Sequence, residues 1–163
     1  MLPFRPVRTP ALALLLSLLL LGSPLPGSVA QAGPPIPASG SFTVVSTTPT
    51  SVRSAGGNTI TTLETTLAIT GTLSGTIELQ ERLVTHATGK LNLHDEGTFA
   101  GTVNGRSGTL RIVANATGDL SAYRGGFTIL GGTGGLAGLR GHVTVAGVPA
   151  VSGTYAGQVH FEP

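Results

Sequence analysis

Four side chains that can exchange protons or donate hydrogen bonds fall on strand faces that are otherwise apolar: Glu81, Asp95, Tyr123 and Tyr155. Successive side chains of a strand point to opposite faces, so alternation sorts each extended run into two faces. The sorting groups Glu81 with Ile77, Leu79 and Leu83, Asp95 with Leu91, Leu93, Phe99 and Val103, Tyr123 with Phe127 and Ile129, and Tyr155 with Val159 and Phe161. A carboxylate in such surroundings is costly unless it is hydrogen-bonded, and burial raises its pKa. The pattern predicts a polar site inside an apolar pocket for a small molecule.

A bulge beside Gly89 or Gly97 is the more ordinary explanation of the same residues. One residue of slip exchanges the two faces of a strand, and bulges are common in barrels. Glu81 and Asp95 would then both face water. If the pocket is catalytic, one of these two acids is the expected general acid or base.

The elements that would position these side chains are strands. Threonine, valine, isoleucine and glycine dominate the chain after residue 40, and no stretch there has helical apolar periodicity. Turn residues separate eight extended runs: 41–47, 59–70, 75–86, 91–103, 108–117, 122–131, 142–147 and 152–161. Short connections, among them the hairpin signal Asn104-Gly105, predict an antiparallel meander. The expected fold is all-β, an eight-stranded antiparallel closed barrel, with a two-sheet sandwich as the alternative.

The glycine-dense stretch Phe127–Gly141 formally contains the dinucleotide pattern G-x-G-x-x-G/A at residues 132–137. That fingerprint requires a following helix and an acid about 20 residues later. The sequence continues with GLRGHVTVAG, and its only later acid is Glu162. The stretch therefore predicts a corner of the barrel, with a turn through Gly131–Gly135 and the next strand starting at Gly138–Gly141.

Residues 1–32 have the order of a secretory signal peptide. Arg5 and Arg8 precede the apolar run Ala11–Leu21, and a small-residue cleavage site ends at Ala32. The run is shorter than the roughly 20 apolar residues that span a membrane. We expect secretion to the extracellular space or periplasm after cleavage near Ala32, with no membrane span left. A proline-rich linker is expected at residues 33–40 and the barrel domain at 41–163.

Composition limits the partners and cofactors. Beyond residue 32 the chain has seven basic and seven acidic residues in no basic cluster, so a nucleic-acid partner is not expected. There is no cysteine and hence no disulfide. The four histidines, His86, His94, His142 and His160, fall on predicted polar faces at spacings that fit no ligand set. Neither a metal nor a cofactor is therefore expected.

Three segments resemble, in order, the landmarks of one bacterial family that has no assigned function and is placed on the allene oxide cyclase-like barrel. They are GSFTVVS at 40–46, VNGRSGTL at 103–110 and GTGGLAGLRG at 132–141. The third is also similar to a stretch of plant dirigent proteins and allene oxide cyclases. The resemblance covers about residues 40–161. It implies an eight-stranded barrel, often a homo-oligomer, whose lumen holds a small hydrophobic molecule. The matching motifs are turns, so the resemblance assigns no site residue.

Two functions follow from these observations. The first is an exported, cofactor-free barrel that binds a small hydrophobic ligand in its lumen, with isomerase-, cyclase- or dirigent-like steering of that ligand. The second is a secreted structural or interaction module whose barrel is filled with side chains and takes no ligand.

Overall fold

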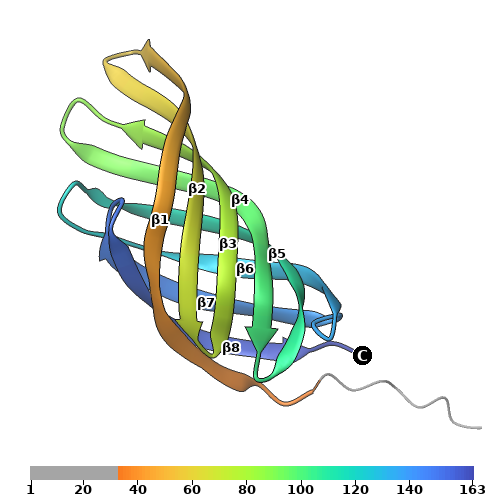
Figure 1. Ribbon diagram of the computed structural model, residues 1–163. Helices are drawn as coiled ribbons and strands as arrows, with labels where there is room; N and C mark the ends of the chain where they lie inside the picture. Colours follow the sequence, from red (N-terminus) through yellow and green to blue (C-terminus); the bar gives the residue numbers. More distant parts are fainter. Residues whose placement is uncertain (1–32) are drawn as a thin grey trace, which may run out of the picture.

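A computed structural model describes residues 33–163, and the predicted signal peptide lies outside the described residues. The described chain consists of eight strands joined by short turns (Figure 1). The strands are β1 (Ile36–Ala55), β2 (Asn58–Gly71), β3 (Leu73–Thr85), β4 (Lys90–Val103), β5 (Arg106–Asp119), β6 (Tyr123–Gly134), β7 (Leu139–Val148) and β8 (Ser152–Phe161).

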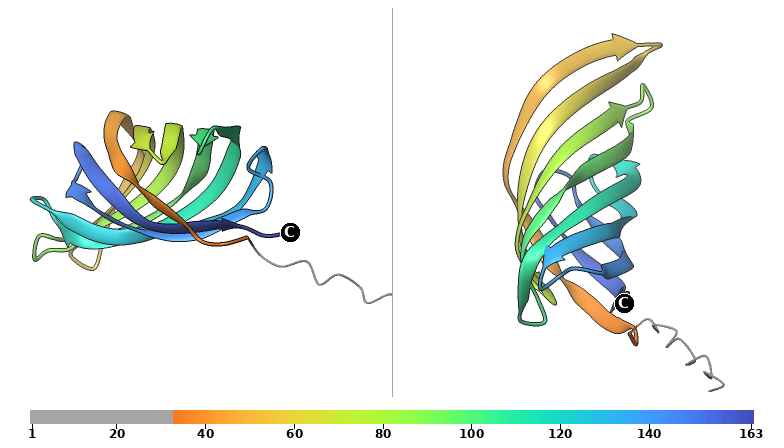
Figure 2. Two further views of the ribbon diagram at one scale, coloured as in Figure 1. Left: turned by 90° about the horizontal axis from the view of Figure 1, so that it is seen from below. Right: turned by 90° about the vertical axis from the view of Figure 1, so that its right-hand side faces the viewer.

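Each strand pairs antiparallel with the next, and β1 also pairs with β8, so the sheet closes into a ring. The predicted all-β, eight-stranded antiparallel closed barrel is confirmed, and the two-sheet sandwich is excluded. Figure 2 shows the strongly twisted strands wrapping around a common interior. Closure pairs β1 on both sides only near residues 40–43, where its pairings with β2 and with β8 overlap.

The first strand is the element that the sequence predicted least well. The expected run of 41–47 is a 20-residue strand, Ile36–Ala55, and most of the expected linker 33–40 belongs to it. Residues 36–39 pair only with β8, so the missing N–H of Pro37 can face the unpaired side of the strand. Beyond Thr43, β1 leaves β8 and pairs only with β2, forming a hairpin whose β1 side is exposed.

Turn chemistry explains the connections. Asn104 and Gly105 both have positive φ, 47° and 79°, as a two-residue hairpin turn of type I′ requires. The glycine-dense stretch does form a corner, but later than expected: β6 continues to Gly134 and β7 begins at Leu139. Leu136 of this turn is completely buried, and a Cβ at Gly132 would collide with the Leu136 carbonyl. Glycine is needed at 132 so that the turn can fold inward and close this end of the barrel.

The interior is packed at one end. Burial alternates along the strands, and the fully buried large side chains gather toward the end that the 135–138 turn closes. They include Leu73, Phe99, Val103, Leu110, Leu136, Leu139 and Val159. The opposite end carries the connections β1–β2, β3–β4, β5–β6 and β7–β8, because consecutive strands run up and down. Within residues 33–163, no helix is long and apolar enough to cross a membrane.

Candidate functional site

The two acids singled out from the sequence face each other across a strand pair. Glu81 on β3 is the direct partner of Asp95 on β4. The ladder between these strands runs without a register shift from Leu73–Val103 to Thr85–Leu91. The bulge that would have turned both acids to water is therefore absent from this strand pair, and that alternative is wrong.

Gly97 does not interrupt the ladder. It lies on the inner face opposite Leu79, where a Cβ would collide with the Glu78 carbonyl. Gly89 lies in the β3–β4 turn with a φ of 81°. Both glycines thus serve close packing and turning, and the alternation on either side of them stays in phase.

Glu81, Asp95 and Tyr123 line one cavity of about 300 Å³ in the unpacked part of the barrel. The rest of its lining is mainly aliphatic and aromatic and comes from β1 to β7 and from two turns at the open end. The volume lies at the lower end of the roughly 300–1,000 Å³ of ligand pockets. An apolar cavity with a few converging polar groups is the usual form of a small-molecule site.

Asp95 is buried without a partner for one of its oxygens. Asp95 is 8% exposed, and its Oδ1 has no hydrogen-bond partner among the described residues. Burial, together with the negative charge of Glu81, raises the pKa of Asp95 to about 7, and nearby His94 only partly offsets this. At neutral pH this carboxyl can therefore both hold and release a proton.

Two threonines extend the polar part of the cavity beyond Glu81. Burial raises the pKa of Glu81, and hydrogen bonding by the Thr65 hydroxyl partly offsets the rise. Thr65 is 4% exposed, and its hydroxyl lies 3.2 Å from that of Thr47 on β1. With Thr65 donating to Glu81, Thr47 donates to Thr65. The sequence pattern singles out neither residue. Thr65 follows the alternation between Leu63 and Leu67, but bulges obscure the face of Thr47.

Tyr123 lies near the open end of the cavity, close enough to both acids for their charges to affect its pKa. It is the first residue of β6 and is half-buried. Burial and the charges of Asp95 and Glu81 raise the pKa of Tyr123 to about 12. Its hydroxyl therefore keeps its proton at neutral pH and is available as a hydrogen-bond donor.

Tyr155 shares the inner face but does not line the cavity. Its hydroxyl accepts a hydrogen bond from the Leu73 N–H at 2.9 Å and donates toward the carbonyl of Thr70 or Leu73, at 3.2 and 3.3 Å. It thereby fastens β8 to the β2–β3 turn in the packed end. Three of the four predicted residues are brought together, and Tyr155 has a structural place apart from them.

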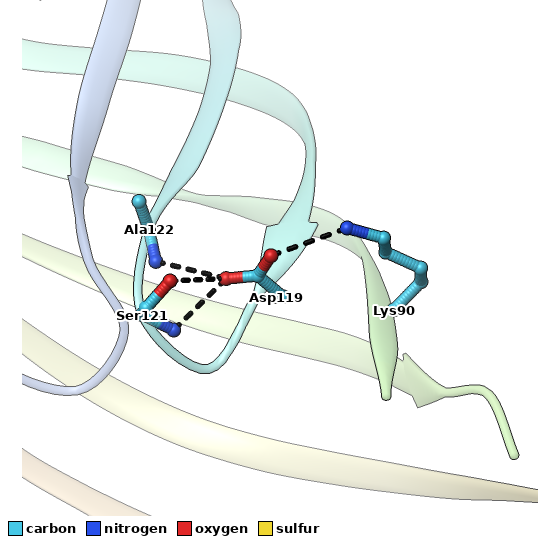
Figure 3. A network of polar contacts seen from close by, with 4 residues as sticks. All are labelled: Lys90, Asp119, Ser121 and Ala122. Carbon is cyan, nitrogen blue, oxygen red and sulfur yellow. Dashed lines mark hydrogen bonds and ion pairs between the residues drawn. The ribbon is translucent and has the colours of Figure 1, made fainter. Parts of the chain in front are cut away.

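The β5–β6 turn shapes the open end of the cavity. Its Leu120 lines the cavity and is 74% exposed. The Asp119 carboxylate holds this turn by accepting hydrogen bonds from the Ser121 N–H and hydroxyl and from the Ala122 N–H, and it pairs with Lys90 at 3.2 Å (Figure 3). These contacts hold the pKa of Asp119 far below its usual range.

A second hollow, of about 850 Å³, lies on the outer face of the sheet. Its charged lining residues are exposed: Glu64, Glu78, Glu96 and Arg111. It contains no buried, unpartnered polar group among the described residues, so the chemistry of interest lies in the lumen.

The histidines lie outside the lumen cavity. His94 and His142 are exposed, His86 and His160 are half-buried, and none lines the cavity. Within residues 33–163, no three His, Asp or Glu side chains gather into a group that could hold a metal ion.

Comparison with known proteins gives one family and two informative structures. Residues 38–156 match the model of a family described as protein of unknown function (DUF3224). A crystal structure of a DUF3224 protein of unknown function from Shewanella oneidensis MR-1 is 20% identical with a TM-score of 0.68, covering 80% of this chain and 99% of that one. The pterocarpan synthase dirigent protein GePTS1 is 16% identical with a TM-score of 0.49, covering 88% and 99%. No curated protein matches.

Proposed function

The chain belongs to the DUF3224 family of proteins of unknown function, and we propose that it is an exported protein that binds a small hydrophobic molecule in its lumen. The observation that carries this proposal is the 300 Å³ cavity, whose apolar wall is interrupted by Glu81, Asp95 and Tyr123. Export rests on the signal-peptide pattern of residues 1–32.

The cost of the acid pair supports a functional role. A buried carboxyl without a hydrogen-bond partner lowers stability, whereas an apolar side chain of similar size would fill the same space favourably. Asp95 Oδ1 is such a group, and it sits in a cavity wide enough for a ligand. A barrel that acted only through its surface would have no use for either feature. The cavity thus favours ligand binding over the filled-barrel module.

The same groups suit the steering of a proton-transfer reaction. An acid with a pKa near the working pH is the most effective general acid or base, and that of Asp95 is about 7. An isomerisation needs one proton removed and one returned, so Glu81 and Asp95 together balance it without a cofactor. Tyr123 would orient the ligand by donating a hydrogen bond.

Titration of the purified protein with N-phenyl-1-naphthylamine, an uncharged apolar fluorophore, tests the proposal. Binding in an apolar cavity is expected to raise its fluorescence saturably with one site per chain. Absence of saturable binding, together with a lumen filled by side chains in an experimental structure, would refute the proposal.

A further inference from the structure

The described lining of the lumen contains acidic side chains but no positively charged ones. Among the described residues that line the cavity there is no Lys, Arg or His, and its titratable side chains are Glu81, Asp95 and Tyr123. The neighbouring strands place no positive charge opposite the acids. Leu63 of β2 is the cross-strand partner of Glu81, and Ala114 of β5 is that of Asp95.

The basic side chains next to the two acids along β3 and β4 lie on the other side of the sheet. Arg82 and His94 are exposed cross-strand partners on the outer face, and His94 pairs there with Glu96 at 3.6 Å and with Asn115 at 2.9 Å. The lumen acids therefore have no protein counter-ion within the cavity.

A carboxylate in an apolar cavity needs a cation or several donors to be stable. Asp95 Oδ1 has neither, although its residue is only 8% exposed and lines the cavity. The missing partner must come from what enters the cavity.

We propose that the hydrophobic molecule bound in the lumen is an amine, whose ammonium group pairs with Glu81 and Asp95 while its apolar body fills the cavity. This inference rests on the proposed function and specifies its ligand class. Two directly opposed acids resist ionising together, so the pair favours one negative charge over two. One ammonium balances that charge and donates up to three hydrogen bonds, enough for Asp95 Oδ1 and Glu81.

The test compares two ligands of the same shape. Binding of 1-naphthylmethylamine, protonated at pH 8, and of uncharged 1-naphthylmethanol is measured by calorimetry. The amine is expected to bind at least about tenfold more tightly, and its advantage is expected to shrink at pH 5, which is below the pKa of about 7 of Asp95. In Glu81→Gln/Asp95→Asn the advantage is expected to disappear while the alcohol still binds. The comparison on the unmodified protein stands even if the double variant fails to fold.

The outcomes separate the two proposals. If the alcohol or N-phenyl-1-naphthylamine binds and the amine has no advantage, the amine inference is overturned and lumen binding stands. If neither naphthyl ligand nor the fluorophore binds, both are overturned. An advantage that survives in the double variant also overturns the inference, because the cation would then be held elsewhere.

Discussion

Glu81 and Asp95 are direct cross-strand partners whose side chains line the same apolar cavity. Opposed like charges destabilise a strand pair, and burial adds to the cost. The acid pair should therefore affect the stability of the protein as well as its ligand binding.

Stability should fall as the pH rises from about 5 to 8. The pKa of Asp95 is about 7 in the folded protein against an ordinary 3.8, so between these values the folded state binds more protons than the unfolded state. Most of this loss falls between pH 5 and the folded pKa of about 7, and at about 1.4 kcal/mol per pH unit it is on the order of 3 kcal/mol. Urea unfolding of the wild type and of Asp95→Asn at both pH values measures it, and the variant should be the more stable at pH 8.

Glu96→Gln is the matched control for that experiment. Glu96 is the next residue of β4 and is exposed on the outer face, so its neutralisation should leave the pH dependence intact. If Asp95→Asn and Glu96→Gln behave alike, Asp95 is not the buried acid that the structure places in the lumen.

Tyr155→Phe should destabilise the protein without weakening ligand binding. Loss of the hydroxyl leaves the buried Leu73 N–H without its partner, at a cost of about 1–3 kcal/mol. Tyr123 lines the cavity, so Tyr123→Phe should have the smaller effect on unfolding and the larger effect on binding of the amine. Urea unfolding and calorimetry distinguish the two, and the reverse order would contradict the assignment of Tyr155 to the packed end.

Asp119→Ala should loosen the β5–β6 turn at the open end. The variant loses the hydrogen bonds to Ser121 and Ala122. Because the pKa of Asp119 is lowered in the folded state, its contribution is present above the unfolded pKa of about 3.9 and is lost as the pH falls below that. Melting curves should therefore separate from the wild type at pH 7 and converge in acid. Lys90→Met removes only an exposed ion pair and should change little.

Most of the fold could be predicted from local patterns. β3 and β4 alternate without a bulge, so simple counting placed Glu81 and Asp95 on the same face, and the Asn104-Gly105 pair marked its hairpin. Local rules failed at β1, where register shifts occur at Val44/Ser46 and Pro49/Ser51. The prolines at the start of β1 are also typical of a linker. They fit a strand only where one side of that strand is unpaired.

The sequence could not predict how deep each inner-face residue lies along the barrel axis. Alternation assigns a residue to the inner face but does not say whether it lies in the packed end or in the cavity. Tyr123 and Tyr155 look equivalent by that criterion, yet one lines the cavity and the other bonds to the backbone of Leu73. That difference depends on the ring closure and on which turns fold inward.

The most direct measurement is fluorophore binding to a protein whose lumen has been filled. Ala114 lies in the cavity wall beside Asp95, so Ala114→Phe should occupy the cavity, whereas Ala100→Phe adds the same side chain at an exposed position of β4. With both variants shown to be folded, Ala114→Phe should lower the affinity for N-phenyl-1-naphthylamine at least about tenfold and Ala100→Phe should leave it unchanged. Equal binding by the wild type and both variants would contradict a ligand site in the lumen.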